Sequence, residues 1–564
     1  MTREELHERA RHWVALDPDS ADRDALRDAI EGDHDATLSQ WMTAAPLAFG
    51  TAGLRGPLQP GPGGMNRANV RFATLGVLGW MHETGQDASR GVIVGRDGRR
   101  NSEAFNDEVV QLLLGAGVRV YELPSPLPTP LVAYCVKALG ATAGIMITAS
   151  HNPPNDNGYK LYAGDGAQII PPDDEIVERH MRAAIAAALD DPRVRDETDA
   201  TLQDRSSPLH VFVSGSVLEE YRTHLVDRFG GANGGPAIAY TPLHGVGGAT
   251  MTRLFEEAGY DEVCVVAAQF DPDPTFPTLP FPNPEEPGAL DFAMAVAEAS
   301  RSTLIIANDP DADRLGAAVR DGARWRVLRG DEIGWLLASS LIDGVHERGE
   351  MVATTIVSST LLEKMARARE VPYATTLTGF KWISRAAGGG VLGFGYEEAL
   401  GFAVDARVSD KDGMSAALAL VKLARSLDLM GSSLLERLDE IEEAFGVHFT
   451  TQLSIRAQGA DGLARLRERV EEITTGPPAA LGECMVSDTS DLSAGFRGLR
   501  GTEGVWLQLG ELGRVVVRPS GTEAKVKAYV EITPPRQGPL KDQRARARDL
   551  SDTVVAALRA LLEA

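Results

Sequence analysis

The fold class is decided by residues 91–154, which read GVIVGRDGRRNSEAFNDEVVQLLLGAGVRVYELPSPLPTPLVAYCVKALGATAGIMITASHNPP. Short apolar runs predict buried strands at 91–95, 118–123 and 143–147. Between them, amphipathic stretches predict helices at 101–115 and 130–139. Strands that alternate with helices are typical of an α/β fold with parallel pairing in its sheets.

The same alternation continues on both sides of this stretch. Thr2 and Glu5 fit a capping box before a helix with Leu6, Ala10 and Trp13 on one face. The polar stretch 190–207 resembles a linker, and a new α/β run begins near His210. The further predicted strands are 237–240, 262–267, 303–307 and 352–358, and the further helices are 250–258, 331–341 and 360–369. After a third run over 318–435, paired strands at 514–517 and 525–532 precede a terminal helix at 551–562.

Composition excludes several classes of protein. The 564 residues are 43% hydrophobic and 24% charged, as in ordinary globular proteins. Three cysteines are too few for a disulfide framework, so we expect a reducing, cytoplasmic location. The net charge of −24 disfavours nucleic-acid and anionic-membrane partners. No apolar run approaches the roughly 20 residues of a membrane span, and MTREELHERARHW lacks a signal-peptide core.

The first loop whose residues could take part in a reaction is TASHNPP at 148–154, directly after a predicted strand. Two prolines after short polar residues favour a tight turn at the strand's carboxyl end, where open α/β sheets place ligands. Ser150 can act there as a nucleophile or phosphoryl carrier, with His151 or Lys160 moving protons. The alternative is a simple turn that exposes a serine.

The second loop is DPDADR at 309–314, again after a strand. Asp309, Asp311 and Asp313 at alternate positions can direct their oxygens at one hard cation, Mg²⁺ or Ca²⁺. An EF-hand does not fit, because Arg314 and Arg320 occupy the positions of its glycine and its last glutamate. A solvated acidic turn is the other interpretation.

The third loop is GYEEALG at 395–401, followed by the turn KDG at 411–413. Glu397 and Glu398 can accept hydrogen bonds from sugar hydroxyls. Taken alone, a pair of glutamates is more often an ordinary surface feature, and the turn at Lys411 is no more specific.

The fourth loop is RPSGTE at 518–523, between two predicted strands. A guanidinium, two hydroxyls and glycine-flanked backbone N–H groups suit a phosphate dianion, although a structural hairpin turn would also account for them. The ending of a P-loop is absent, so nucleotide binding of that type is not supported. Salt screens charge over about 8–10 Å, so nearby cations can attract a phosphate despite the net negative charge of the protein. The cations in question are Arg314, Arg518, Lys525 and Lys527.

These loops, in this order, resemble the α-D-phosphohexomutase family of phosphoglucomutases and phosphomannomutases. The resemblance covers nearly the whole chain from Phe49. Its motifs are FGTAGLRG (49–56), TASHNPP, NGYK (157–160), TPLHGVGG (241–248), DPDADR, TGFKWI (378–383), GYEEALG, SDKDG (409–413) and RPSGTEAK (518–525). Length and the GYEEALG form are most similar to the longer branch with phosphoglucomutase 2-type enzymes and phosphopentomutases.

The resemblance implies an α/β protein of four domains around a central cleft. Three are similar α/β units with mixed sheets, and the C-terminal one is α+β. We place an N-terminal helix plus phosphoserine domain at 1–208 and a metal-binding domain at 209–317. A sugar-binding domain follows at 318–436, and a phosphate-binding domain at 437–564.

The resemblance also implies roles for single residues. Ser150 would be phosphorylated, Arg55 would contact the phosphoserine, and Lys160 would be a general acid/base with His151 nearby. Mg²⁺ would be held by Ser150, Asp309, Asp311 and Asp313. The residues expected to bind substrate are Arg314, Gly379, Phe380, Lys381, Glu397, Glu398, Lys411, Arg518, Ser520, Gly521 and Thr522.

The implied reaction interconverts the 1-phosphate and 6-phosphate of glucose or mannose through a phosphoserine and a bisphosphate. Mg²⁺ would be the cofactor and a sugar 1,6-bisphosphate the activator of a monomer or dimer. Many family members have a serine where this chain has Ala399, which leaves a phosphopentomutase as the main alternative. A sugar phosphatase and a noncatalytic phosphosugar-binding protein are more distant alternatives.

Overall fold

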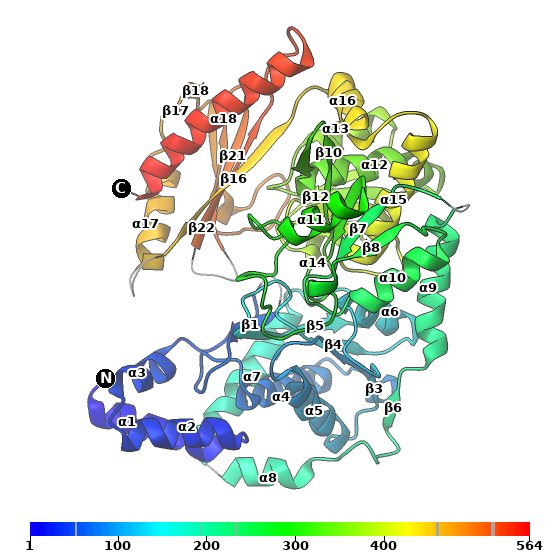
Figure 1. The fold of residues 1–564 in the computed structure, drawn as a ribbon. Helices are drawn as coiled ribbons and strands as arrows, with labels where there is room; N and C mark the ends of the chain where they lie inside the picture. The colour runs from blue at the N-terminus through cyan, green and yellow to red at the C-terminus, as the bar shows by residue number, and fades with distance from the viewer. Residues whose placement is uncertain (51–52, 192, 232–233, 458–461, 521–524, 564) are drawn as a thin grey trace. The chain divides into compact units, whose positions relative to one another are not determined.

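The computed structural model describes residues 1–50, 53–191, 193–231, 234–457, 462–520 and 525–563 (Figure 1). Three α/β segments, each built on a sheet with parallel strand pairs, are followed by a segment with an antiparallel sheet. Most of the predicted strands and helices are confirmed to within a few residues.

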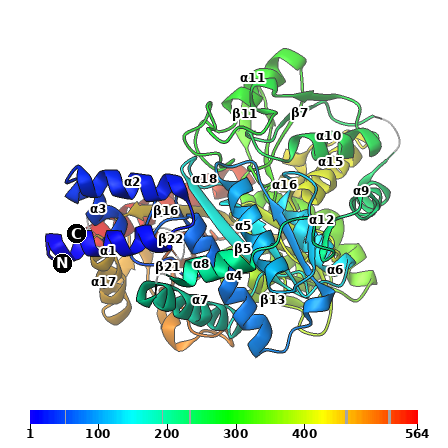
Figure 2. The same cartoon turned by 90° about the horizontal axis from the view of Figure 1, so that it is seen from below.

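The chain begins with three helices rather than one. They are α1 (Arg3–Leu16), α2 (Ser20–Glu31) and α3 (Asp35–Thr43). The capping box of Thr2 and Glu5 is present, and Leu6, Ala10 and Trp13 are buried as the sequence pattern predicts. Helix α1 packs on α2 and α3, as Figure 2 shows, and also contacts α7 and α8 of the first α/β segment.

The first sheet has the strand order β1-β5-β4-β2-β3-β6. Its strands are β1 (Leu54–Pro57), β2 (Val92–Arg96), β3 (Val120–Glu122), β4 (Ala143–Ile147), β5 (Asp156–Ala163) and β6 (His210–Phe212). The pairs β4–β2, β2–β3 and β3–β6 are parallel, whereas β1–β5 and β5–β4 are antiparallel. The carboxyl ends of β2 and β4 therefore meet at one edge of the sheet.

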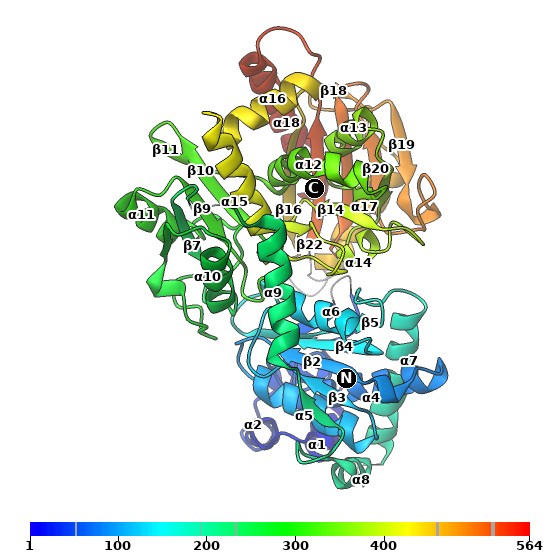
Figure 3. The same ribbon diagram turned by 90° about the vertical axis from the view of Figure 1, so that its right-hand side faces the viewer.

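The helices of this segment are α4 (Arg67–Glu83), α5 (Ser102–Gly115), α6 (Thr129–Ala138), α7 (Asp173–Asp190) and α8 (Arg193–Thr201). Helices α5 and α6 pack directly on the strands, whereas α7 packs on α4 and α8 packs on α7. Helix α5 packs on α4, and Figure 3 shows α5 and α6 on opposite sides of the strands. Short 3₁₀ turns occur at Ala88–Arg90, Ala267–Gln269 and Leu492–Ala494.

Two details of this segment differ from the sequence predictions. The polar stretch 190–207 contains α8, because its charged residues form a surface helix. His210 does not open a new sheet, since β6 pairs with β3 at the edge of the first one. Local pattern could not show this pairing between distant parts of the chain.

The second sheet has the order β11-β10-β9-β7-β8. Its strands are β7 (Ile238–Thr241), β8 (Val263–Val265), β9 (Leu304–Ala307), β10 (Gly316–Asp321) and β11 (Arg324–Val327). The helices are α9 (Gly215–Phe229), α10 (Gly248–Glu257) and α11 (Asp291–Ser300). Strand β9 lies parallel to β7 and ends directly before the DPDADR loop.

The third sheet has the order β13-β12-β14-β15. Its strands are β12 (Met351–Thr355), β13 (Tyr373–Thr376), β14 (Leu392–Glu397) and β15 (Gly401–Ala403). The helices are α12 (Gly330–Glu347), α13 (Leu361–Ala368), α14 (Phe380–Ile383), α15 (Gly413–Leu429) and α16 (Leu434–Phe445). Strand β14 ends at Glu397, so the sheet itself positions the two glutamates.

The last segment has an antiparallel sheet of order β16-β22-β21-β20-β19 and a short β17–β18 pair. The strands are β16 (Phe449–Arg456), β17 (Ala480–Leu481), β18 (Cys484–Met485), β19 (Asp488–Asp491), β20 (Val505–Gln508), β21 (Gly513–Pro519) and β22 (Lys525–Ile532). The helices are α17 (Gly462–Thr475) and α18 (Leu540–Glu563), and α18 is longer than predicted.

Contacts divide the chain into two compact units. Unit 1 contains residues 1–317 and 407–418, and unit 2 contains residues 318–406 and 419–564. Each unit contributes candidate site residues, and each is described by itself below. None of the helices in the described ranges has the length and apolar character needed to cross a bilayer.

Candidate active site

Ser150 lies in a strained turn at the carboxyl end of β4. Its backbone φ is +53°, and its side chain is buried. Its Oγ donates a hydrogen bond of 2.7 Å to Oδ2 of Asp309. Nδ1 of His151 lies 3.2 Å from the same Oγ, so a carboxylate and an imidazole both contact the candidate phosphoryl carrier.

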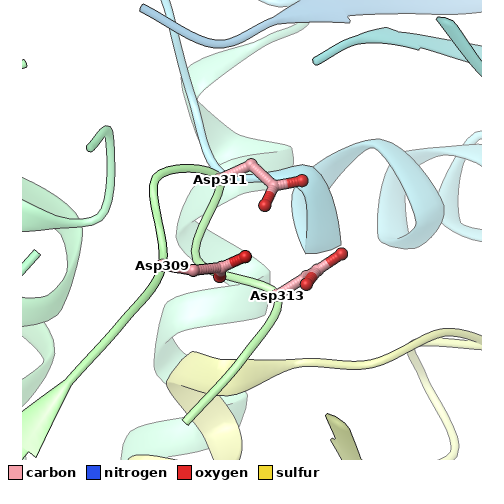
Figure 4. A group of neighbouring side chains, drawn as sticks. All are labelled: Asp309, Asp311 and Asp313. Carbon is pink, nitrogen blue, oxygen red and sulfur yellow. The ribbon is translucent and has the colours of Figure 1, made fainter. Parts of the chain in front are cut away.

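The DPDADR loop gathers three carboxylates from one short stretch of chain. Figure 4 shows the side chains of Asp309, Asp311 and Asp313 directed from this loop toward a common space. All three residues are fully buried, and one oxygen from each lies within 4.8 Å of the others. The prediction that alternate aspartates converge is therefore correct in geometry.

Cations surround these carboxylates within unit 1. Nζ of Lys160, on β5, lies 2.7 Å from Oδ2 of Asp311 and 2.7 Å from Oδ2 of Asp313. Nζ of Lys411 lies 3.1 Å from Oδ2 of Asp313. The turn that carries Lys411 can approach because Gly413 has no side chain: a Cβ there would lie 2.2 Å from the carbonyl oxygen of Arg314.

The pKa values follow from this crowding. Burial, together with the charges of Asp311 and Asp313, raises the pKa of Asp309 well above its ordinary value. Burial also acts on Asp311 and Asp313, but Lys160 and Lys411 outweigh it and lower the pKa of both carboxyl groups. Burial lowers the pKa of Lys160, yet its two aspartates outweigh that effect, and the net pKa is raised. Lys160 is thus held as an ammonium ion by its two aspartate partners.

The carboxylate cluster fits a hard divalent cation. Oδ1 of Asp311 and Oδ1 of Asp313 are buried and accept no hydrogen bond from any described residue. Buried carboxylate oxygens without donors are costly unless something else compensates their charge. Mg²⁺ prefers oxygen ligands of this kind, so the residues present match the cofactor expected from the sequence.

Two arginines border the cluster. Arg55, on β1, donates from Nη1 to Oδ1 of Asn152 at 3.1 Å, and its buried Nε has no acceptor among the described residues. Burial lowers the pKa of Arg55, although the three aspartates act in the opposite direction. Nη1 of Arg314 lies 3.5 Å from Oε2 of Glu285, and Nε of Arg314 lies 4.0 Å from Oδ2 of Asp309. Both guanidinium groups are thus close to the turn and the loop.

In unit 2, the TGFKWI stretch contains the whole of the short helix α14. Gly379 has φ +105°, a conformation that favours glycine. The side chain of Phe380 is buried against Ala353, Ile383 and Ala403, so it belongs to the core. Nζ of Lys381 lies 6.0 Å from the centre of the Trp382 ring. Of the three predicted substrate contacts, Phe380 can therefore offer a ligand only its backbone.

The two glutamates after β14 differ in their surroundings. Glu397 is half-buried at the end of the strand. Oε2 of Glu398 accepts hydrogen bonds from Ser358 Oγ at 2.9 Å and Thr355 Oγ1 at 3.2 Å, and burial raises its pKa. The Glu398 side chain is thus tied to the protein itself, which favours Glu397 as the sugar ligand.

The RPSGTE loop begins where β21 ends. Nε of Arg518 is buried without an acceptor among the described residues, and the N–H of Ser520 donates to the carbonyl of Lys525 at 2.8 Å. Strand pairing places Lys527 opposite Arg518, which adds a second cation. The other two predicted phosphate ligands, Gly521 and Thr522, lie outside the described residues.

Comparison with known families agrees with this geometry. The chain matches "Phosphoglucomutase/phosphomannomutase, alpha/beta/alpha domain I" over residues 46–187, domain II over 219–322 and domain III over 329–444. It matches the C-terminal domain of the same family over residues 486–547. The chain belongs to the phosphoglucomutase/phosphomannomutase family. The expected four-domain α/β architecture is confirmed, and the chain is an enzyme of the intramolecular phosphotransferase class.

Individual members of the family show how broad it is. The chain is 37% identical to a "Probable phosphomannomutase" of Haemophilus influenzae, over 83% of this chain and 93% of that protein. It is 33% identical to a "Probable phosphoribomutase" of Schizosaccharomyces pombe, over 93% of each. The structure of the phosphoglucomutase pp63/parafusin from Paramecium has a TM-score of 0.66 at 16% identity, covering 92% of this chain and 96% of that one. The last comparison shows a shared fold.

The sequence motifs did not identify all of the residues that build the site. Thr129, the first residue of α6, donates from Oγ1 to Oδ2 of Asp311 at 2.6 Å and from its N–H to the carbonyl of Asp311 at 2.9 Å. Arg99 donates to the backbone of the Ser150 turn. The signal for Arg99 was its place in GRDGRR, directly after a buried strand that pairs with β4.

Proposed function

We propose that this enzyme interconverts hexose 1-phosphates and hexose 6-phosphates, with glucose or mannose as the sugar, through a phosphorylated Ser150. The hydrogen bond between Ser150 Oγ and Asp309 Oδ2 carries the proposal. It places a hydroxyl nucleophile against a carboxylate cluster that fits a divalent cation. That pairing suits phosphoryl transfer, which depends chiefly on positioning and charge stabilisation.

In the proposed reaction, phosphorylated Ser150 gives its phosphoryl group to the free hydroxyl of a sugar phosphate. The bond between phosphorus and Ser150 Oγ breaks, a bond to the sugar oxygen forms, and the hydroxyl proton passes to the enzyme. The resulting sugar bisphosphate turns around, and its other phosphate returns to Ser150. A sugar 1,6-bisphosphate added from outside would therefore phosphorylate any enzyme whose Ser150 has lost its phosphoryl group, which accounts for the expected activator.

Residues of unit 1 would perform the transfer. Nδ1 of His151 is close enough to move a proton at Ser150 Oγ. Lys160 would be the general acid/base that handles the proton of the sugar hydroxyl. Arg55 would contact the transferred phosphoryl group through the donor that now lacks an acceptor. Asp309, Asp311 and Asp313 would hold Mg²⁺, which supplies charge neutralisation of the phosphoryl oxygens when bound.

Residues of unit 2 would bind the part of the substrate that does not react. We assign sugar hydroxyls to Glu397 and the backbone of the 379–381 stretch. We assign the second phosphate to Arg518 and Ser520, together with Gly521 and Thr522. The phosphoserine and metal-binding domains would contain the matched residues 46–187 and 219–322. The sugar-binding and phosphate-binding domains would contain 329–444 and 486–547. The expected boundaries at 208/209 and 436/437 need adjustment, because β6 belongs to the first sheet and α16 crosses the second boundary.

The test is ³¹P NMR of the purified enzyme with Mg²⁺ and a trace of glucose 1,6-bisphosphate. Glucose 1-phosphate, mannose 1-phosphate and ribose 1-phosphate are supplied separately. Conversion of a hexose 1-phosphate resonance into its 6-phosphate, faster than ribose 1-phosphate reacts, is expected. Growth of inorganic phosphate alone would indicate a phosphatase, and no change with any sugar would reject the assignment.

A pentose phosphate is the second candidate substrate. The observation that favours it is the 33% identity with a "Probable phosphoribomutase" over 93% of both chains. Ala399, beside the sugar-binding glutamates, offers no hydroxyl to a hexose. Faster conversion of ribose 1-phosphate than of either hexose in the same NMR experiment would establish this candidate instead.

A further inference from the structure

Two turns lie side by side at the carboxyl ends of neighbouring strands in the first sheet. Strands β2 and β4 are parallel, and Arg96 is the register partner of Ile147 at their carboxyl ends. The residues that follow, 97–99 and 148–150, therefore leave the sheet together. The N–H of Asp97 donates to the carbonyl of Ile147 at 3.0 Å, which fixes the two turns to each other.

The turn at Ser150 needs support from its surroundings. A non-glycine residue with φ +53° is strained by about 1–2 kcal/mol relative to an ordinary conformation. One support is local, since the N–H of Ser150 donates to Oγ1 of Thr148 at 2.8 Å. Such conformations persist where the surrounding structure holds them, and they are frequent at active sites.

The second support is the guanidinium of Arg99. Its two terminal nitrogens donate to four carbonyl oxygens of the turn. Nη2 lies 2.5 Å from the oxygen of Ser150 and 2.6 Å from that of Asn152, and Nη1 lies 2.9 Å from that of Pro153 and 3.1 Å from that of Asp156. One buried side chain thus holds the backbone of residues 150–156, the segment that begins at Ser150.

Arg99 is itself held from two sides. Oδ1 of Asp97 accepts from the N–H of Arg99 at 3.0 Å and from Ser102 Oγ at 2.7 Å. Oδ2 of Asp97 lies 3.4 Å from Nε of Arg99. The ring of Phe276, which lies in the second family domain, is 4.9 Å from the guanidinium carbon. The cation therefore has little freedom to leave the turn.

We propose that Arg99 is a positioning residue for phosphoryl transfer. It acts on the backbone of residues 150–156 and touches none of the reacting atoms. By holding the carbonyl of Ser150 it fixes the direction of Oγ toward Asp309. The inference rests on the proposed function, because it concerns the same serine. Lysine cannot replace it, since one ammonium cannot span four carbonyl oxygens in the plane of a guanidinium fork.

The test combines two readouts on Arg99→Lys and Arg99→Ala. The first is steady-state mutase kinetics, and the second is hydrogen exchange measured by mass spectrometry on peptides covering 148–157 and 67–83. Arg100→Ala is the matched control, because the adjacent Arg100 side chain is exposed and its side-chain hydrogen bond, of 3.4 Å, goes to the side chain of Asn155. Arg99→Lys keeps a cation beside Asp97, so it guards against a variant that fails to fold.

We expect both Arg99 variants to lose kcat by about 10²-fold, because misplacement of a reacting group costs about that much. KM should stay near the wild-type value, and exchange should increase at 148–157 but not at 67–83. Added guanidinium ion should restore part of the lost kcat of Arg99→Ala.

Wild-type kcat in Arg99→Lys, or a loss of kcat without faster exchange at 148–157, would overturn the role of Arg99. A wild-type enzyme that converts no sugar phosphate would instead reject the proposed function. The two failures are distinguishable. The role of Arg99 is judged by comparing its variants with the wild type, whereas the proposed function is judged from the activity of the wild-type enzyme alone.

Discussion

The Oγ of Ser150 and the Oδ2 of Asp309 lie 2.7 Å apart, although 159 residues separate them in the chain. One follows a strand of the first sheet and the other a strand of the second. Each motif alone has an ordinary interpretation, as a turn or as an acidic loop. Their contact joins a nucleophile to a cluster of cation ligands, and this is the feature on which the proposed chemistry depends.

Replacement of Ser150 by alanine should abolish turnover. Ser150→Ala removes the oxygen that would carry the phosphoryl group, so kcat should fall by about 10³-fold or more. Binding of glucose 6-phosphate, measured by calorimetry, should remain within a few-fold of wild type. Ser89→Ala, at an exposed serine that contacts Asp87, is the control. Full activity of Ser150→Ala would exclude a phosphoserine mechanism.

Replacement of Asp309 should uncouple stability from Mg²⁺. In the wild type, Mg²⁺ at 100 times its Kd should add about 2.7 kcal/mol to the free energy of unfolding. Asp309→Asn removes one of three crowded carboxylates, so the metal-free protein should become more stable and the gain with Mg²⁺ should disappear. Melting curves with Mg²⁺ or EDTA measure both effects, with Asp291→Asn as the control. An unchanged gain with Mg²⁺ would show that Asp309 is not a ligand.

The N-terminal helices should lose stability as pH rises. Burial raises the pKa of Asp17 to about 7 from 3.8, because the neutral acid is the form that the fold accommodates. The folded state then binds more protons than the unfolded state between these values. The free energy of opening α1 should therefore fall by about 2–4 kcal/mol between pH 4 and pH 7.

Hydrogen exchange of residues 3–16, corrected for the intrinsic pH dependence, measures this free energy. Asp17→Asn should flatten the profile, and Asp24→Asn, on the exposed side of α2, controls for the loss of one carboxylate. A profile that stays equally steep in Asp17→Asn would assign the pH dependence to another group.

A buried carboxylate should hold unit 2 together. Glu531 accepts hydrogen bonds from Ser359 Oγ at 2.8 Å, His448 Nδ1 at 2.8 Å and Arg514 Nε at 2.9 Å. Burial alone would raise the pKa of Glu531, but Arg514 and His448 outweigh it and lower that pKa below its usual range. Its contribution to stability is therefore present above the unfolded pKa and is lost in strong acid.

Glu531→Gln should cost about 3 kcal/mol at neutral pH, since it leaves the half-buried Arg514 without its charge partner. Urea unfolding of this variant beside Glu483→Gln, at an exposed site, measures the difference. Equal midpoints for the two variants would show that the network contributes no net stability.

The sugar preference should respond to residue 399. Ala399→Ser places a hydroxyl in the half-buried turn after Glu397. One added hydrogen bond contributes about 0.5–1.5 kcal/mol, so kcat/KM for glucose 1-phosphate should rise by about 2- to 10-fold relative to ribose 1-phosphate. The ratio of the two kcat/KM values is the measurement. An unchanged ratio would place residue 399 outside the sugar site.

Strand ends were the part of the site that local pattern predicted well. Ser150 and Asp309 each follow a short apolar run, and period and turn residues suffice to recognise such runs. The convergence of the three aspartates also followed from their alternate spacing. Helices α2 and α3 were not predicted, because each fully buries only two apolar residues and therefore has a weak apolar pattern in the sequence.

The contacts that complete the site could not be predicted in this way. Lys411 reaches Asp313 only because Gly413 admits the backbone of Arg314, a relationship between distant segments. Strand β6 pairs with β3 although several helices lie between them in the sequence. Arg99 contacts the Ser150 turn because β2 and β4 are neighbours in the sheet. The side chain of Phe380 has a motif position but lies in the core. Each of these depends on tertiary packing rather than on local periodicity.

The most direct test of the account follows a labelled phosphoryl group. Enzyme phosphorylated with ³²P is mixed with unlabelled glucose 1-phosphate and Mg²⁺ and quenched within milliseconds. The account predicts that label leaves Ser150 and enters glucose 1,6-bisphosphate and then glucose 6-phosphate as fast as the enzyme turns over. Label that remains on the protein during turnover, or leaves only as inorganic phosphate, would contradict it.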